Sequence, residues 1–327
     1  MKDFNILFTS SGRRVSLLRH FREALQKLGL RGRLVSADLQ KHAPASFVAD
    51  DRELVPRVTD QAYVTALLEI CRRRGSRLLV PLIDTELHLL APHRKAFEDI
   101  GVTLLVSSEE VNHLSLDKRR TREFFIEAGV MTPEILDPAA ILASQNPAYP
   151  YLLKPAQGSC SVGVTKIRDE KELRFFLDYV PDPIVQYLVQ GEEYTLDILV
   201  DFEGNARCVV PRLRIETRAG EVSKGMTVKH PGIIAAGKKV AEALPGALGC
   251  ITVQCFLTRS GDIVFIEINP RFGGGYPLSF AAGADFPKWI IQMVLGEVID
   301  IKLDGWQDGL VMLRYDEGIF VDKKDII

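Results

Sequence analysis

The chain of 327 residues has little cysteine, no long apolar run and almost no excess of charge of one sign. Its five cysteines are odd in number and form no CxxC pair, so neither a disulfide framework nor a zinc site is expected. No apolar run reaches the length of about 18 residues that a membrane span needs. The formal net charge of −2 disfavours a nucleic-acid binder that relies on a broad basic surface.

Two common nucleotide-binding loops and a signal peptide are also missing. The first strand-to-helix turn, residues 9–14, has no GxGxxG, and no GxxxxGK[ST] occurs, which disfavours a dinucleotide fold and a Walker A loop. The N-terminal residues are typical of a strand and a turn and lack the apolar core of a signal peptide. We therefore expect a cytoplasmic protein that binds neither nucleic acid nor membrane.

The first third of the chain alternates strand and helix patterns. At about 150 residues per domain, the length suggests two domains or three small ones. Repeated strand–helix units predict a parallel, doubly wound sheet that ends near residue 112. The predicted strands are residues 4–10, 32–38, 77–84 and 102–108, and the predicted helices are residues 13–29, 60–75 and 86–101.

The pattern then changes to a helix followed by strands with short connections. Residues 114–135 contain a helix that Gly129 and the downstream Pro133 close. The rest predicts a mainly antiparallel α+β region. Its predicted strands are residues 150–156, 162–168, 183–189, 193–200, 206–215, 250–258 and 262–270, and its predicted helices are residues 172–180 and 233–246.

The segment FIEINPRFGGG, residues 265–275, sets polar residues into an apolar strand. With Ser260-Gly261 as a two-residue hairpin turn, Gln254 lies opposite Glu267, and Asn269 shares the face of Glu267. Three oxygen-bearing side chains then converge, and this donor set suits Mg²⁺. A polar edge face without a metal is the alternative, and this segment alone does not decide between them.

A second segment, LLKPAQGSCSVGV at residues 152–164, joins two predicted strands through small residues. Lys154 enters the loop, whose amides and hydroxyls are suited to bind an anion such as a phosphate. An ordinary glycine-serine hairpin is the alternative. The residues that would allow a ligand to approach the backbone closely are Gly158, Ser159, Ser161 and Gly163.

A third segment, VQYLVQGEEYTLDIL at residues 185–199, is by itself only a strand, a glycine turn and a strand. The backbone of Gln186, Tyr187 and Leu188 could form hydrogen bonds with the edge of an adenine. Glu193 could accept hydrogen bonds from ribose hydroxyls. This segment gains meaning only from its place between the other two.

In this order the three segments resemble the ATP-grasp superfamily over residues 113–275, where "DK" at 117–118 opens a helix and "EINPR" closes the match. The region before them resembles the pre-ATP-grasp domain. The resemblance implies a Rossmann-like α/β domain over residues 1–112. It further implies an α+β ATP-grasp fold, with a small subdomain over residues 113–190 that carries the phosphate loop and a large subdomain over 191–327 that carries the metal and catalytic site.

The resemblance also implies a role for each motif residue. The cofactors would be ATP and Mg²⁺ or Mn²⁺, and Arg271 would stabilise the transferring phosphoryl or acyl-phosphate group. The implied catalytic residues are Arg271 and Lys154. The implied ATP-binding residues are Lys118, Lys154, Gly158, Ser159, Ser161, Gln186, Tyr187, Leu188 and Glu193, and the implied metal ligands are Gln254, Glu267 and Asn269.

The implied reaction activates a carboxylate as an acyl phosphate, which an amine or ammonia then attacks. Residues 253–275 most resemble one half of the carbamoyl-phosphate synthase large subunit, but the synthase has two ATP-grasp units and has arginines where this chain has Lys118 and Lys154. That departure is closer to a carboxylate–amine ligase. A non-catalytic ATP-binding regulatory module and a subunit of a larger synthase complex stay open as alternatives. The expected partners are a small carboxylate and an amine, and a homodimer is compatible with the resemblance.

Weaker candidates for a substrate site lie outside the motifs. Asp84 and Glu86, just beyond a predicted strand, could bind an amine, although a helix N-cap explains Asp84 equally well. Residues 9–14 could bind an anion at a helix N-terminus or be a capped turn. Three basic residues of segment 212–231 could hold a substrate carboxylate, with a polar loop as the alternative: Arg214, Arg218 and Lys224.

Overall fold

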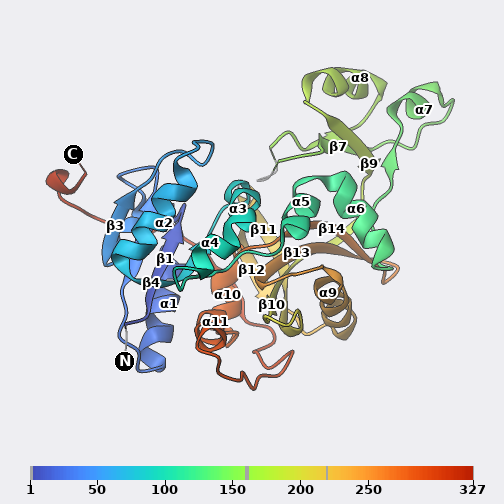
Figure 1. Cartoon of the computed structure of the whole chain (residues 1–327). Coiled ribbons are helices and arrows are strands. Elements are labelled where there is room, and N and C mark those ends of the chain that lie inside the picture. The colour runs from blue at the N-terminus through green and yellow to red at the C-terminus, as the bar shows by residue number, and fades with distance from the viewer. Residues whose placement is uncertain (1–2, 159–161, 219, 327) are drawn as a thin grey trace.

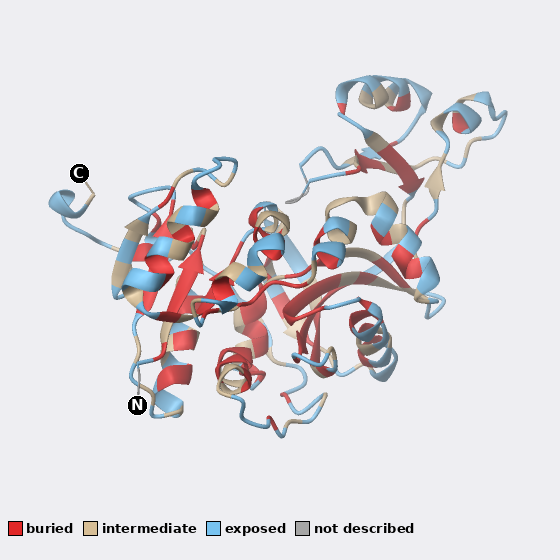
Figure 2. Cartoon of the chain, viewed as in Figure 1, coloured by how far each residue is buried: buried red, intermediate tan, exposed pale blue. Residues whose placement is uncertain are grey.

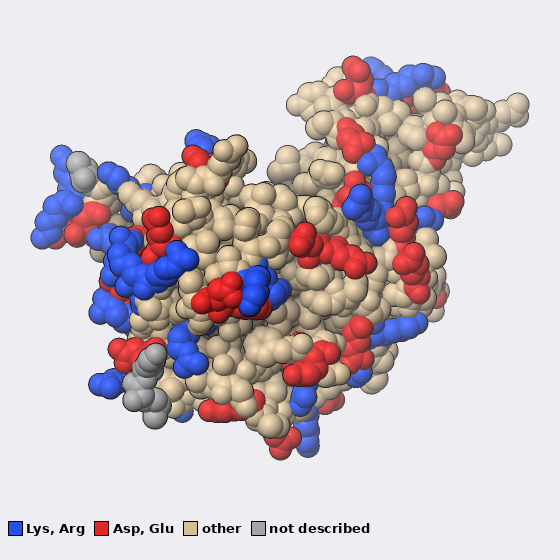
Figure 3. All heavy atoms as spheres, viewed as in Figure 1, with Lys and Arg blue, Asp and Glu red and all other residues tan. Residues whose placement is uncertain are grey.

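The computed structural model describes residues 3–158, 162–218 and 220–326 (Figure 1). Three β-sheets follow one another along the chain. The four-stranded sheet and its helices α7 and α8 stand apart from the rest of the molecule in Figure 1. On the face shown in Figure 3, acidic and basic side chains are interspersed, as the small net charge predicts. Among the described residues, no helix is long and apolar enough to cross a lipid bilayer.

The first sheet has five strands, all parallel, in the order β3-β2-β1-β4-β5. The order reverses between β1 and β4, and the loops beyond such a point are where open α/β sheets bind ligands. This sheet confirms the predicted α/β domain. Its strands are β1 (Asn5–Thr9), β2 (Leu34–Asp38), β3 (Asp51–Leu54), β4 (Ser76–Pro81) and β5 (Thr103–Leu104). Its helices are α1 (Val15–Lys27), α2 (Tyr63–Arg74), α3 (Asp84–Leu90) and α4 (Arg94–Glu98), with 3₁₀ turns η1 (Pro44–Phe47) and η2 (Ala91–His93).

Two details of this domain differ from the sequence patterns. Strand β3 is absent from the predicted elements, because its residues alternate half-buried and exposed and three of the four are charged. Short, charged strands are typical of sheet edges, where they hinder further pairing. The helix predicted over residues 86–101 is instead divided into α3, η2 and α4, because Pro92 has no amide hydrogen to continue the helical ladder.

Two helices lead into a four-stranded antiparallel sheet of order β6-β9-β7-β8. Helix α5 (Glu109–Leu116) runs through residue 112, and α6 (Lys118–Glu127) begins where the Asp117 carboxylate accepts the Arg119 amide at 2.8 Å. The strands are β6 (Ile135–Leu136), β7 (Tyr151–Pro155), β8 (Thr165–Ile167) and β9 (Pro183–Tyr187), and the covering helices are α7 (Pro138–Ala143) and α8 (Glu170–Tyr179).

The last sheet has six antiparallel strands in the order β14-β13-β10-β11-β12-β15. Helix α9 packs against β10 and β11, and α6 packs against β14. The antiparallel sheets confirm the predicted α+β region. The strands are β10 (Gly191–Val200), β11 (Ala206–Arg218), β12 (Glu221–Thr227), β13 (Gly249–Thr258), β14 (Ile263–Asn269) and β15 (Val311–Leu313). The helices are α9 (Pro231–Ala243), α10 (Tyr276–Ala281) and α11 (Phe286–Val294), with a last 3₁₀ turn η3 (Lys323–Asp325).

The first and last sheets share one hydrophobic core. Phe21 of α1 packs edge-on against Phe8 and Phe272, with ring centroids 5.0 and 5.9 Å apart, and Phe272 packs against Tyr276. All four rings are buried, as are the central strands of both sheets in Figure 2. The four-stranded sheet has a separate core around Leu153. The shared core therefore fixes the carboxyl edge of the parallel sheet against the segment that follows β14.

Candidate active site

A cavity of about 500 Å³ lies between the four-stranded and the six-stranded sheets. Strand β7 and the loop after it form one wall, and β10, β11, β13 and β14 form the other. More basic than acidic side chains line the cavity, so its charge favours an anionic ligand. The basic residues are Arg14, Lys118, Lys154, Arg212, Arg214 and Arg271, and the acidic ones are Glu193, Glu221 and Glu267.

The hairpin of β13 and β14 brings the predicted metal residues to this cavity. Gln254 pairs with Glu267 and Thr252 with Asn269, which confirms the predicted pairing of Gln254. The predicted two-residue turn is wrong, because the Thr258 amide donates to the Asp262 carbonyl at 2.9 Å and leaves a three-residue loop. A β-bulge in β14 offsets this one-residue difference and restores the pairing.

The bulge also changes which side chains face the cavity. Cys255 pairs with Phe265 and Gln254 pairs with Glu267, so Ile266 is an extra residue in β14. In a regular strand, neighbouring side chains point to opposite faces. Here Ile266 and Glu267 both line the cavity. One strand thus supplies an apolar and an acidic side chain in succession, an arrangement that strand alternation alone does not predict.

The oxygen atoms of the predicted metal ligands already face cationic groups. Arg214 Nη1 donates to Gln254 Oε1 at 3.3 Å, and Arg271 Nη2 donates to Asn269 Oδ1 at 3.2 Å. Glu267 lies beside Gln254 on the same wall. One carboxylate and two amide oxygens that point toward positive charge fit a hard divalent cation such as Mg²⁺.

Two lysines face this acid from the opposite wall. Burial is the main cause that lowers the pKa of Lys154 to about 8; Glu267 opposes the shift and Lys118 adds to it. Burial also lowers the pKa of Lys118, again against the attraction of Glu267. The Lys118 ammonium donates to the Gly158 carbonyl at 3.0 Å, which ties it to the predicted phosphate loop. The structure therefore brings together residues that are more than one hundred positions apart in the chain.

Only part of the predicted phosphate loop can be described. Gly158 lines the cavity with φ +120°, a conformation that favours glycine. Gly163 has φ +73°, and a Cβ on it would lie 3.0 Å from the Pro155 ring. Ser159 and Ser161 lie outside the described residues.

The end of the cavity near β9 is apolar. Leu188 lines it, as predicted for the adenine segment, whereas the Gln186 side chain is buried and donates to the Pro133 carbonyl at 3.4 Å. Tyr187 is half exposed and does not line the cavity. Four further apolar residues that the sequence motifs did not indicate complete this end: Leu152, Val164, Phe256 and Ile266.

Glu193 and Arg214 form an ion pair of 2.8 Å inside the cavity. Burial raises the pKa of Glu193, and Arg214 opposes this shift. Arg214 also donates to the Gly220 carbonyl at 2.9 Å. The arginine therefore lies between the predicted ribose acid and the predicted metal ligands, not at a separate substrate carboxylate site.

Arg271 connects the metal hairpin to the N-terminal domain. Its Nη2 donates to Asp84 Oδ2 at 2.7 Å, and Asp84 is the first residue of α3. Burial opposes the charge of Arg271, but Asp84, Glu267 and Cys250 together raise the pKa of the guanidinium. Asp84 thus contacts the predicted catalytic arginine.

Glu86 is a correction, because it is fully buried and cannot meet a substrate amine. It accepts hydrogen bonds from Tyr63 Oη at 2.6 Å, Ser10 Oγ at 3.1 Å and the Leu82 amide at 2.8 Å. Burial raises its pKa, and the hydrogen bonds from Tyr63 and Leu82 oppose the shift. Its role is to hold the loops after β1 and β4 together.

Arg218 and Lys224 are also corrections, because the structure places both outside the cavity. They belong to the β11–β12 hairpin, not to a loop crossing the cleft. Arg218 is 78% exposed and pairs with Asp316 at 2.9 Å, and Lys224 pairs with Glu216 at 2.7 Å. Neither side chain is therefore placed to hold a substrate carboxylate in this cavity.

The three glycines after Arg271 make room for side chains of the cavity wall. A Cβ on Gly275 would lie 2.2 Å from Arg212 Nη1, and one on Gly274 would lie 3.1 Å from Arg14 Nη1. Arg212 is buried and paired with Asp197 at 2.7 and 3.0 Å. The FGGG sequence is therefore needed for the close approach of Arg14, which belongs to the candidate segment 9–14, and of Arg212, which the sequence analysis did not single out.

Two antiparallel sheets that enclose a cation-rich cleft, with oxygen ligands on one wall and lysines on the other, define the ATP-grasp class of fold. Residues 115–275 match the family model described as "ATP-grasp domain", and residues 6–105 match "PylC-like, N-terminal domain". Residues 115–275 therefore form an ATP-grasp domain.

Curated relatives are distant. 3-Methyl-D-ornithine–L-lysine ligase of Methanosarcina mazei is 25% identical over 211 residues, which are 59% of this chain and 49% of the relative. A pyruvate carboxylase subunit from Methanothermobacter thermautotrophicus is 24% identical over 318 residues, which are 86% of this chain and 64% of the relative. This chain thus spans about half to two thirds of these two proteins.

Solved structures share the fold. The biotin carboxylase domain of 2-oxoglutarate carboxylase from Hydrogenobacter thermophilus has a TM-score of 0.73 at 20% identity, over 95% of this chain and 74% of that one. An L-amino acid ligase from Bacillus licheniformis has a TM-score of 0.69 at 17% identity, over 91% and 75%. These similarities extend the fold match from the ATP-grasp domain to nearly the whole chain.

Proposed function

We propose that this protein is an ATP- and Mg²⁺-dependent ligase that joins a small carboxylic acid to an amine or ammonia. The observation that carries the proposal is the convergence of two lysines and an oxygen ligand set on opposite walls of one cavity. Polyphosphate binding needs cations, and a divalent cation needs oxygen ligands. The residues are Lys118 and Lys154 on one wall and Gln254, Glu267 and Asn269 on the other.

The cavity has the polarity expected for ATP. Its apolar end would take the adenine, with Leu188 and Phe256 on its sides, and Glu193 lies where ribose hydroxyls would pass. Lys154 and Lys118 would bind the phosphates, whose negative charge would favour the protonated state of both lysines. Gln186 would contribute only backbone groups, because its side chain is turned toward Pro133.

The proposed reaction has two steps. A carboxylate oxygen of the acid forms a bond to the γ-phosphorus of ATP while the bond to the ADP oxygen breaks, which gives an acyl phosphate. The amine nitrogen then bonds to the acyl carbon, and inorganic phosphate leaves as the nitrogen loses a proton. Arg271, beside Asn269, would hold the oxygens of the transferring group, since charge stabilisation is the main task in such transfers.

Gln254, Glu267 and Asn269 would hold Mg²⁺ or Mn²⁺. The bound cation supplies neutralisation of phosphate charge. The residues of this chain orient the phosphates toward the acid and exclude water from the cleft. This donor set suits a hard divalent cation because two amide oxygens and one carboxylate lie on the same pair of strands, β13 and β14.

The resemblance to carbamoyl-phosphate synthase is proposed only for the metal hairpin. Lys118 and Lys154 face the cavity in place of the arginines of the synthase, and the named relatives are other ligases and carboxylases. A ligase for another carboxylate fits these observations better. The proposed partners are a small acid and an amine, and a homodimer would agree with the Hydrogenobacter structure, which is described as a dimer.

The test is ADP release from ATP and Mg²⁺ in the presence of a panel of acids paired with amines. With the active acid labelled by ¹⁸O in its carboxylate, we expect ¹⁸O in the released phosphate, because an acyl phosphate transfers that oxygen. Lys154→Ala should remove ADP formation, and Lys224→Ala, whose side chain lies outside the cavity, should keep it. Tight MgATP binding without ADP release for any pair would favour a regulatory module or a subunit of a larger complex.

A further inference from the structure

Arg14 is the one described residue of the N-terminal domain that lines the ATP-grasp cavity. It lies in the turn between β1 and α1 and precedes the first residue of α1. A Cβ on Gly274 would be 3.1 Å from Arg14 Nη1 and 3.0 Å from the Glu221 carboxylate. The guanidinium therefore reaches across the domain boundary to the segment that follows the metal hairpin. Arg13 beside it is exposed and does not line the cavity.

The charges around Arg14 leave one cation in excess. Arg271 is paired with Asp84 at 2.7 Å, and Glu221 is paired with Arg314 at 3.0 Å. Among the described residues, Arg14 donates no side-chain hydrogen bond and forms no ion pair within 4 Å. Burial and the charge of Arg271 lower its pKa to about 10, although Glu221 and Asp84 oppose this. A guanidinium held in this way lacks an anion, and leaving it uncompensated is unfavourable.

We propose that Arg14 binds the carboxylate of the acid substrate and thereby makes the N-terminal domain part of the specificity site. A guanidinium forms paired hydrogen bonds with a carboxylate, which a lysine cannot reproduce. The carboxylate would lie on the cavity side of Arg14 and Arg271. Gly274 is needed there because a Cβ on it would crowd Arg14 and Glu221 at 3.1 and 3.0 Å. Arg271 is at the same time beside Asn269, so this location adjoins the metal ligands. The inference depends on the proposed function, because it assigns a subsite of the same cavity.

Two features of the surroundings support an acid over a neutral substrate. Asp84 and Glu221 already have cationic partners, so added negative charge would not face an unpaired carboxylate. Arg212, behind Gly275, is neutralised by Asp197 and adds no competing site. Arg14 is thus the cation that remains available to a ligand in this part of the described structure.

The binding test uses malonate as a carboxylate probe, titrated by calorimetry into protein saturated with ADP and Mg²⁺. Arg14→Ala should weaken malonate binding by about 10- to 100-fold, the loss expected for a hydrogen-bonded charge pair. Arg14→Lys should bind with intermediate affinity, and Arg13→Ala should stay within about twofold of wild type. All variants should bind MgADP equally. Malonate binding that is equal in Arg14→Ala and Arg13→Ala, or absent from the wild type, would overturn the inference.

A kinetic test separates specificity from structure. With the acid that supports ADP release, Arg14→Lys should raise the KM of the acid at least tenfold and leave the KM of ATP unchanged. If Arg14→Ala does not fold, as judged by thermal unfolding, Arg14→Lys and Arg14→Gln give the decision. If the wild type does not bind MgADP, the proposed function is contradicted. If nucleotide binding is intact and Arg14→Lys has the same KM for the acid as the wild type, only the role of Arg14 is contradicted.

Discussion

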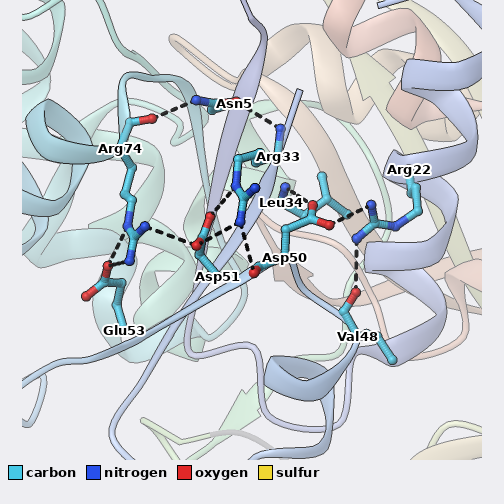
Figure 4. A network of polar contacts seen from close by, with 9 residues as sticks. All are labelled: Asn5, Arg22, Arg33, Leu34, Val48, Asp50, Asp51, Glu53 and Arg74. Atoms are coloured by element: carbon cyan, nitrogen blue, oxygen red, sulfur yellow. Dashed lines mark hydrogen bonds and ion pairs between the residues drawn. The ribbon is translucent and has the colours of Figure 1, made fainter. Parts of the chain in front are cut away.

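The two edges of the N-terminal parallel sheet differ sharply in how their polar groups are satisfied. At the amino edge, Figure 4 shows a network in which every labelled charge has a partner. Asp51 accepts from Arg33 at 2.6 and 3.0 Å and from Arg74 at 3.0 Å, and Asp50 accepts from Arg22 at 3.1 Å. Asn5 bridges the starts of β1 and β2 through the amide of Arg33.

The carboxyl edge holds groups under constraint. Ser10 has φ +49°, which is unusual for a residue other than glycine, and its hydroxyl donates to the buried Glu86. From this edge, the Asp84 side chain reaches the last domain and pairs with Arg271. The Arg14 side chain also extends from this edge, but it has no hydrogen-bonded partner among the described residues. One oxygen of Asp84 and the Nε of Arg271 are buried without a partner among the residues that the structure describes.

The comparison teaches that stability and function are placed at opposite ends of the same strands. At the amino edge, ion pairs from Arg33 and Arg74 hold the edge strand β3 against the rest of the sheet. Incompletely paired charges at the carboxyl edge face the cleft, where a ligand can complete them. The following substitutions sharpen or break this distinction, from the largest expected effect to the smallest.

Among the substitutions that compare the two edges, Arg271→Ala should give the largest loss of activity. Removing a group that stabilises the transferring phosphoryl is expected to lower the rate of acid-dependent ADP release by about 10²- to 10³-fold. The matched variant at the other edge, Asp51→Ala, should keep the wild-type rate per folded molecule. Equal rate losses in both variants would mean that the two edges do not differ in function.

Gly275→Ala should be the most destabilising small change at the cleft. Its Cβ would lie 2.2 Å from Arg212 Nη1 and 2.5 Å from Val222, and overpacking of this kind typically costs about 1–3 kcal/mol. Denaturant unfolding measures the change. Gly318→Ala is the control, because its nearest neighbour would be the flexible Phe320 ring at 3.3 Å. A Gly275→Ala variant as stable as this control would refute the packing argument.

The lowered pKa of Lys154 predicts that ATP binding depends on pH. Because its pKa in the free protein is about 8, the lysine is charged below this pH and loses its charge as the pH rises. If binding requires the charged form, the affinity for MgATP should fall up to about tenfold between pH 7 and pH 9. Lys154→Arg stays charged over this range and should show a flat profile in calorimetric titrations, provided that it still binds.

Asp51→Asn should give the smallest effect, a loss of about 1 kcal/mol in the free energy of unfolding, because Arg33 is largely exposed. The hydrogen bond from Arg33 holds the pKa of Asp51 below its usual value. The stabilisation is therefore present above the unfolded pKa and is lost as the pH falls through the lower folded pKa. Urea unfolding of both proteins at neutral and acidic pH checks this, and a constant difference at all pH values would contradict it.

Much of the fold follows from local patterns, because strand and helix periodicities need no tertiary information. The predicted pairing of Gln254 with Glu267 is correct although the predicted turn is wrong, since the three-residue loop and the bulge at Ile266 cancel. Neither feature has a distinct local signal. Strand β3 escapes prediction because an edge strand of charged residues resembles a loop.

The sequence predicts those site residues that belong to a motif within one continuous segment. Lys118, Lys154 and Glu267 belong to such motifs, and the structure places all three at the cavity. Residues 9–14 and Asp84 are only weaker candidates in the sequence, because Arg14 before α1 and Asp84 at the start of α3 lie beside the metal hairpin only through the core that the two sheets share. Glu86 resembles a site residue because it follows a strand, yet the helix turns it into the interior.

The central claim is that the β13–β14 hairpin holds a divalent cation that binds ATP in the cleft. The direct measurement is calorimetry in which ATP is titrated into the wild type and into Glu267→Gln, once in the presence of Mg²⁺ and once in the presence of a chelator. We predict that Mg²⁺ strengthens ATP binding to the wild type and that this gain disappears in Glu267→Gln. An equal gain from Mg²⁺ in both proteins would contradict the account.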